Sequence, residues 1–166
     1  MNDFSKNIAN VFLRPDEKEM IESAIKEAEE KTSAEIVVSI VGKIVDGGGR
    51  IGRYLSRNSV ESKVRNFAVK HFMDLGIQQT EGRTGILILV AVQEARVEII
   101  ADKAINDKYD ESLLPKCVEC IIEASAKGDP VRGLLVTINR LRDILSKDFP
   151  RTENDVNEVS NAVQSS

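Results

Sequence analysis

The sequence predicts an α/β fold, in the form of a three-layer α/β/α sandwich around a small mixed sheet. Three observations predict it. Four segments repeat apolar residues every three or four positions, as helices do. Three short runs are rich in Val, Ile and Leu, and two of those runs are separated by only four residues, the length of a hairpin loop. The predicted order is helix, strand, helix, hairpin, helix, helix.

The predicted helices begin and end at residues typical of helix termini. Pro15 opens the first helix, and Asn58 with Glu61 resembles a capping box that opens the second. Gly76 is well placed as a left-handed cap at the end of the second helix, and Asp129 caps the last one. The predicted helical ranges are 15–31, 58–76, 113–127 and 130–145.

Three strands are predicted, Glu35–Val41, Ile86–Val92 and Val97–Ala101. The second and third form a hairpin and are therefore antiparallel. The first strand reaches the hairpin through a helical crossover, so we expect it to lie parallel to one hairpin strand, with a right-handed connection. The sheet is accordingly mixed.

A chain of 166 residues fits one domain, which we place at residues 14–150, after an N-terminal arm at 1–13. Residues 151–166 are rich in Asn, Ser, Glu and Gln. Because they offer little apolar surface for folding, we expect this C-terminal tail to be disordered.

Composition and charge argue against several classes of protein. The net charge is −4, and the chain has no Trp and only two Tyr, so it lacks the positive field and the stacking aromatics of nucleic-acid binders. The longest apolar run, Gly85–Val92, is far shorter than the roughly 20 residues of a membrane span, and the N-terminus does not resemble a signal peptide. We expect a cytoplasmic protein with reduced cysteines.

The segment after the hairpin, Asp102 to Glu111, concentrates carboxylates and amides. The oxygens of Asp102, Asn106, Asp107 and Asp110 are ligands of the kind that Ca²⁺ or Mg²⁺ prefers. The alternative is a solvated loop of helix-capping carboxylates, because the spacing does not match the alternating calcium-loop pattern.

A ligand pocket of Glu35, Arg83 and Asp102 is also predicted. Glu35 opens the first strand, Arg83 precedes the second and Asp102 follows the third, so all three belong at one edge of the sheet if the first strand runs parallel to the second. Glu35 and Arg83 either complete this pocket with Asp102 or simply pair with each other.

Three other motifs are better explained by structural roles than by ligand binding or catalysis. Gly47, Gly49 and Gly52 form a G-x-G-x-x-G without a tight strand or helix junction, so we expect a mobile loop over 42–57 and no nucleotide or organic cofactor. Cys117 and Cys120 fall inside a helix, where core packing is the expected role. His71 is the one histidine, and the sequence shows no nucleophile–base pair around it.

Read in order, several segments resemble the TPM domain family over roughly residues 13–150. They are Thr32-Ser33-Ala34-Glu35-Ile36, Arg83-Thr84-Gly85-Ile86-Leu87-Ile88, Arg96-Val97-Glu98-Ile99 with Asp102 and Ile105, Gly128-Asp129 with Gly133-Leu134, and Phe149-Pro150. The chain departs from the family pattern at Ala34 and Ala104, where Gly is usual, and at Thr84, where Asn is usual.

The resemblance implies an α/β/α sandwich, with acid phosphatase activity and calcium binding in some members and accessory roles in membrane-complex maintenance in others. Two functions follow as hypotheses. The first is a cation-binding accessory module whose surface engages a protein partner. The second is a metal-assisted phosphomonoesterase, in which carboxylates hold the metal and Arg83 neutralises developing charge.

Overall fold

A computed structural model describes residues 13–44 and 57–165. Of the predicted N-terminal arm only Leu13 lies within these ranges, and most of the predicted glycine-rich loop lies outside them. The predicted mobility of residues 42–57 therefore stays a prediction.

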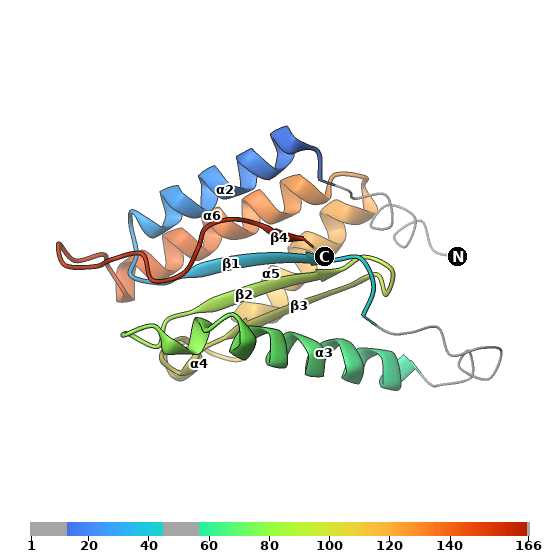
Figure 1. Ribbon diagram of the computed structural model, residues 1–166, viewed down its shortest axis with the longest axis horizontal. Coiled ribbons are helices and arrows are strands. Elements are labelled where there is room, and N and C mark those ends of the chain that lie inside the picture. Colours follow the sequence, from blue (N-terminus) through green and yellow to red (C-terminus); the bar gives the residue numbers. More distant parts are fainter. Residues whose placement is uncertain (1–12, 45–56, 166) are drawn as a thin grey trace.

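The main elements appear in the predicted order (Figure 1), with boundaries shifted by a few residues. The helices are α2 (Pro15–Glu29), α3 (Arg57–Asp74), the 3₁₀ turn η2 (Ile77–Gln79), α4 (Lys103–Lys108), α5 (Leu113–Ala126) and α6 (Pro130–Asp148). The strands are β1 (Ile36–Val41), β2 (Ile86–Ala91), β3 (Arg96–Ala101) and β4 (Gln164–Ser165). The sequence did not predict η2, α4 or β4.

The sheet is mixed, as predicted, and its strand order is β3-β2-β1-β4. β1 runs parallel to β2, with Ile36 beside Ile86, and β2 runs antiparallel to β3, with Ile86 opposite Ala101. Glu35, Gly85 and Asp102 directly adjoin Ile36, Ile86 and Ala101 in the chain. The register therefore places these three residues in one row at the same end of three adjacent strands.

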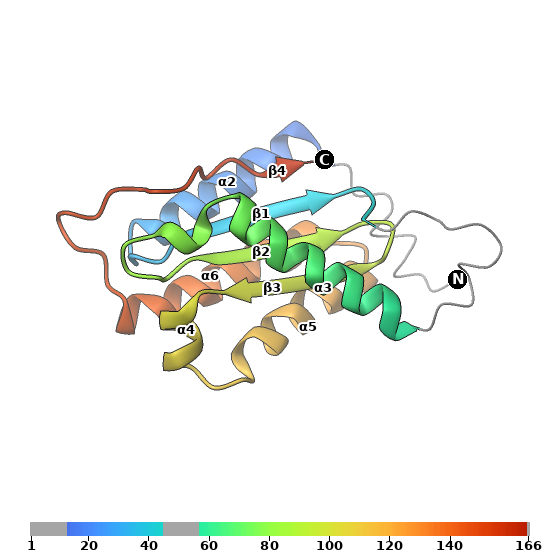
Figure 2. The same cartoon turned by 60° about the horizontal axis from the view of Figure 1, so that its bottom comes forward.

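Helices cover both faces of the sheet, which confirms the three-layer sandwich. Figures 1 and 2 show α2, α5 and α6 on one face and α3 on the other. β1 and β2 are buried on both sides, and their side chains alternate between two cores. Ile36 and Val38 point toward α2, α5 and α6, whereas Val37 points toward α3.

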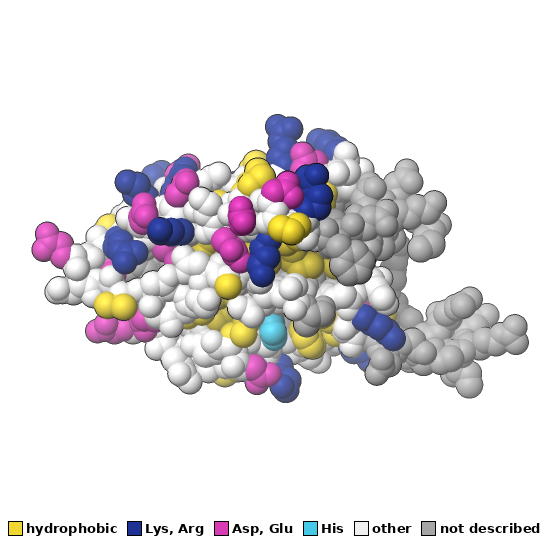
Figure 3. Space-filling model, turned by 45° about the horizontal axis from the view of Figure 1, so that its top comes forward, with side chains coloured by type: hydrophobic (Ala, Val, Ile, Leu, Met, Phe, Trp, Pro, Cys, Tyr) yellow, Lys and Arg dark blue, Asp and Glu magenta, His cyan; other side chains and the backbone are white. Residues whose placement is uncertain are grey.

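On the outer surface in Figure 3, positive and negative side chains are intermingled over the helices.

Two predicted helix termini are confirmed. Gly76 follows α3 with φ of 72°, a left-handed conformation in which a residue with a β-carbon is strained. The Asp129 side chain accepts a hydrogen bond from Arg132 N at 3.1 Å and caps α6. Asn58 lies inside α3, which already begins at Arg57.

The C-terminal segment differs from the disorder predicted for 151–166. Residues 151–165 follow a defined course back along β1, and β4 pairs with β1 at Ser39 (Figure 1). Val163 is buried in the core, and its N–H donates to Glu22 Oε1 at 2.9 Å. Composition missed this because a single buried valine and a few backbone N–H bonds to acceptors elsewhere in the fold hold the tail, and averages over 16 residues do not register them.

None of the described helices is long and apolar enough to cross a membrane.

Candidate functional site

Arg83 and Asp102 form a two-point ion pair at the edge of the sheet. Arg83 Nε donates to Asp102 Oδ2 at 2.7 Å, and Arg83 Nη2 donates to Asp102 Oδ1 at 2.9 Å. The carboxylate is buried, whereas the arginine side chain is 54% exposed. The pair raises the pKa of the Arg83 guanidinium, chiefly through its hydrogen bonds with Asp102. The sequence predicted that these two residues lie side by side, because a hairpin brings its two ends together.

Local backbone structure holds both partners in place. Arg83 has a left-handed backbone with φ of 53°, and its carbonyl oxygen accepts from Ala104 N at 3.1 Å. Asp102 donates its N–H to Gly85 O at 2.8 Å, and its side chain accepts from Lys103 N at 2.6 Å as the N-cap of α4. Asp102 is therefore engaged both as a helix cap and as the partner of Arg83.

Glu35 lies at the same end of the sheet but has different partners. Its Oε1 accepts from Glu158 N at 3.1 Å, while Oε2 is buried and has no hydrogen-bond partner among the described residues. Burial raises the pKa of this carboxyl. Ile77 packs against Gly85, which stands between Glu35 and Asp102 in the row. The structure thus joins Arg83 to Asp102, whereas Glu35 contacts the C-terminal segment.

Glu29 is a third buried carboxyl at this site, and it was not predicted from the sequence. Its Oε1 accepts from Ile36 N at 3.0 Å and its Oε2 from Asn157 Nδ2 at 3.3 Å. Burial raises its pKa to about 8, and the nearby Glu35 carboxylate acts in the same direction. The signal was present in the sequence, because Glu29 stands four residues after Ile25 and so continues the apolar stripe of α2.

The predicted acidic loop is largely the helix α4, whose side chains bond within the protein. Asn106 Nδ2 donates to Ala101 O at 2.6 Å, and Asp107 pairs with Lys103. Asp110 accepts from the Ser112 hydroxyl at 2.6 Å and from its N–H at 2.8 Å, which lowers the pKa of Asp110. Within residues 13–44 and 57–165, no group of three or more His, Cys, Asp or Glu side chains is placed to hold a metal ion. As arranged, these side chains do not fit a Ca²⁺ or Mg²⁺ ion.

A serine–histidine pair was also missed. Ser39 Oγ and His71 Nε2 lie 3.0 Å apart, because β1 and α3 face each other there. The expectation that the chain has no nucleophile–base pair is therefore wrong in its literal form. Ser39 is only 1% exposed, however, and burial lowers the pKa of His71, whose ring stacks on Phe67. The pair satisfies a buried hydroxyl and does not present a nucleophile to solvent.

The cysteines lie where the sequence predicted. Cys117 is fully buried in the core beside Ile121, and Cys120 is half-buried one turn along α5. Both are free thiols, and burial raises the pKa of Cys117. A thiol with a raised pKa is a poor nucleophile, so packing is the role that the geometry supports.

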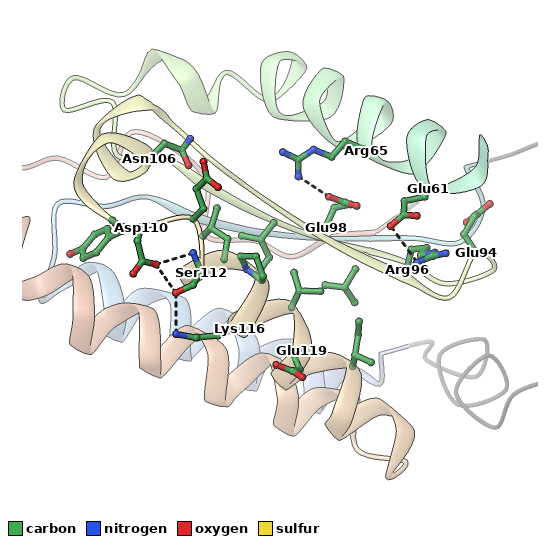
Figure 4. A pocket seen from close by; sticks show the side chains of 18 of the residues that line it. Glu61, Arg65, Glu94, Arg96, Glu98, Asn106, Asp110, Ser112, Lys116 and Glu119 are labelled. Carbon is green, nitrogen blue, oxygen red and sulfur yellow. Dashed lines mark hydrogen bonds and ion pairs between the residues drawn. The ribbon is translucent and has the colours of Figure 1, made fainter. Parts of the chain in front are cut away.

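A wide groove of about 1540 Å³ runs along β3, the outer strand of the sheet, between α3 and α5 (Figure 4). On the α5 side, Leu114, Val118 and Ile122 recur every four residues and form a partly exposed apolar wall. On the α3 side, Arg65 pairs with Glu98 at 3.0 Å. This groove was not predicted from the sequence, because it forms between elements that are distant along the chain.

The comparison with solved structures finds a similar fold. The NMR structure of BA42 protein from the psychrophilic bacterium Bizionia argentinensis matches with a TM-score of 0.78 and 27% sequence identity. The match covers 95% of this chain and 97% of that one. No curated protein matches the chain.

The comparison with family models identifies the domain. The model of the TPM domain matches residues 8–144. This range includes β1, β2, β3 and most of α6, but not β4. The likeness first read from the strand starts, the hairpin and the Gly128-Asp129 helix start is thereby confirmed, and the chain belongs to the TPM domain family.

Proposed function

We propose that this TPM domain is a binding or accessory module that engages a protein partner. The observation that carries the proposal is the groove along β3, which combines a large concave surface, an apolar wall and an outer strand. Such surfaces accept peptide segments. In the predicted ligand pocket, by contrast, Arg83 and Asp102 already bond to each other. A cytoplasmic location and the lack of a nucleotide, an organic cofactor or a nucleic-acid partner stay predictions.

A metal-assisted phosphatase is the alternative, and the geometry favours it less. Such an enzyme needs carboxylates free to hold a metal and a cation free to meet the phosphate. Here Asp102 and Arg83 neutralise each other. Ser39, whose hydroxyl lies 3.0 Å from His71 Nε2, is buried.

Hydrolysis of a chromogenic phosphate monoester separates the two functions. With Mg²⁺ or Ca²⁺ present, we expect wild type and Asp102→Asn to show the same rate as buffer. The reasons are that Asp102 is paired with Arg83, and that no group of three or more His, Cys, Asp or Glu side chains among the described residues is placed to hold a metal ion. Matched thermal unfolding curves would show that the variant folds. If wild type hydrolyses the ester and the hydrolysis rate falls at least tenfold in a folded Asp102→Asn variant, the protein is a phosphatase and the proposal of a binding module is wrong.

Cation binding at Asp102, Asn106, Asp107 and Asp110 stays a prediction, and the structure defines what it requires. Asp102 would have to exchange Arg83 for the ion, and Asn106 would have to offer its amide oxygen while its Nδ2 donates to Ala101 O. Arg83 thus competes with the cation for the same carboxylate.

This competition gives the cation hypothesis a sharp test. If the site exists, Ca²⁺ at millimolar concentration should move the backbone amide signals of residues 102–111, and Arg83→Ala should bind more tightly because Asp102 is released. Lys70→Ala, which breaks an exposed pair with Asp74 on α3, is the control and should leave the titration unchanged. Amide signals that stay still in both wild type and Arg83→Ala would remove the cation from the proposal.

A further inference from the structure

We infer that the groove along β3 binds an extended, basic segment of a partner protein, which pairs with β3 as a fifth strand. The inference deepens the proposed function and rests on it, since it specifies the chemistry of the partner. It is carried by three features of the described residues: the outward backbone groups of β3, the apolar wall of α5 and an excess of acidic side chains around the groove.

Along the outer edge of β3, several backbone groups have no hydrogen-bond partner among the described residues. Asp102 N–H bonds to Gly85 O across the hairpin, so by alternation the backbone groups of Val97, Ile99 and Ala101 face away from β2. The carbonyl oxygen of Ala101 already accepts a hydrogen bond from Asn106 Nδ2. Within the part of the chain that the structure describes, no hydrogen bond occupies the outward groups of Val97 and Ile99. An added strand would pair with these groups.

The two walls of the groove set the side-chain pattern of the partner. Residues of the added strand that stand opposite Val97 and Ile99 would point to the same side as these side chains, toward Val118 and Ile122 of α5. The intervening residues would point toward α3, where Arg65 and Glu98 pair. An extended segment with apolar residues at alternate positions satisfies both walls.

Charge selects a basic segment. Among the residues that the structure describes, six acidic and three basic side chains line the groove. Two of the basic side chains already pair with acidic ones, Arg65 with Glu98 and Arg96 with Glu61, and Lys116 bonds to the Ser112 hydroxyl (Figure 4). The acidic excess that remains includes Glu119, which is exposed on α5. The same excess disfavours a second copy of this chain as the occupant, since two acidic rims would face each other.

A titration of the isotopically labelled full chain tests the inference. The probe is a blocked seven-residue peptide of alternating lysine and valine, compared with a version that carries glutamate in place of lysine and one whose valines are N-methylated. We expect the lysine peptide to bind, to shift the amide signals of β3 and of residues 114–122, and to slow hydrogen exchange at Val97 and Ile99. The other two peptides should bind at least tenfold more weakly, because one is repelled and the other lacks the backbone donors.

Variants assign the binding to the groove. Glu119→Lys should weaken the lysine peptide about threefold, the scale of one exposed ion pair. Glu123→Lys, one turn further along α5 and outside the groove, is the matched control and should leave affinity unchanged. Val118→Asp should weaken binding at least tenfold, because it places a carboxylate in the apolar wall.

Three results would overturn the inference. They are no binding of the lysine peptide at millimolar concentration, binding without slowed exchange at Val97 and Ile99, and self-association of the free chain through β3. If the lysine peptide does not bind and phosphate ester hydrolysis stays at the buffer rate, only the inference of an added strand is wrong. The proposed interaction module is then not contradicted. Asp102-dependent hydrolysis would instead remove the proposed function itself.

Discussion

Gly85→Ala is expected to destabilise the domain by about 3 kcal/mol, the upper range for overpacking a well-packed core. A β-carbon at Gly85 would lie 2.3 Å from Ile77 Cγ2 and 2.7 Å from the carbonyl oxygen of Ile77. The side chain of Ile77 is itself fully buried, and the second contact is with backbone. The clash therefore cannot be relieved by turning one side chain, and η2 would have to move away from the sheet.

Urea unfolding followed by circular dichroism measures this loss. Gly82→Ala is the matched control, because its β-carbon would meet only the Thr84 side chain, at 3.3 Å. We expect that control to lie within about 0.5 kcal/mol of wild type. Ile77→Ala combined with Gly85→Ala should cost less than the sum of the two single changes, since the shortest contact is gone. Equal stabilities of Gly85→Ala and Gly82→Ala would show that η2 does not pack on the sheet as described.

Glu29→Gln is expected to remove much of the pH dependence of folding. The pKa of Glu29 rises from 4.5 to about 8 on folding, so between these values the folded protein binds a proton that the unfolded chain does not. The favourable contribution is complete below pH 4.5, falls as the pH rises, and is lost above pH 8. At about 1.4 kcal/mol per pKa unit, the loss is at most about 5 kcal/mol.

Glutamine keeps an oxygen that accepts from Ile36 N but carries no charge at any pH. Between pH 5 and pH 9, we expect the unfolding free energy of wild type to fall by a few kcal/mol and that of Glu29→Gln to fall by clearly less. The variant should be the more stable protein at pH 9. Glu35, whose pKa burial also raises, supplies a remaining slope of the same sign.

Glu30→Gln is the control for this measurement. It makes the same chemical change at the next residue, where the side chain is exposed. Its stability should follow the wild-type curve at every pH. Parallel curves for wild type and Glu29→Gln would mean that Glu29 is ionised in the folded protein and that the C-terminal segment does not shield it.

The local signals in the sequence were sufficient for the layers and for two of the three residues of the predicted pocket. The hairpin between β2 and β3 follows from two apolar runs four residues apart, and a hairpin necessarily places Arg83 next to Asp102. The helical crossover predicts that β1 runs parallel to one hairpin strand, and the structure shows that this strand is β2. These features depend on residues that are close in the chain, or on chirality rules that hold for nearly every protein.

Only the tertiary structure decided what the remaining groups contact. Whether Glu35 meets Arg83 or Glu158 depends on the course of a C-terminal segment that lies over 120 residues further along the chain, and composition cannot report such a contact. The burial of Glu29 and the Ser39–His71 pair likewise arise from packing between elements. The groove along β3 forms for the same reason, since its walls come from three elements that fold together. Hydrophobic periodicity shows which face of an element is buried, whereas the partners on that face are selected by packing.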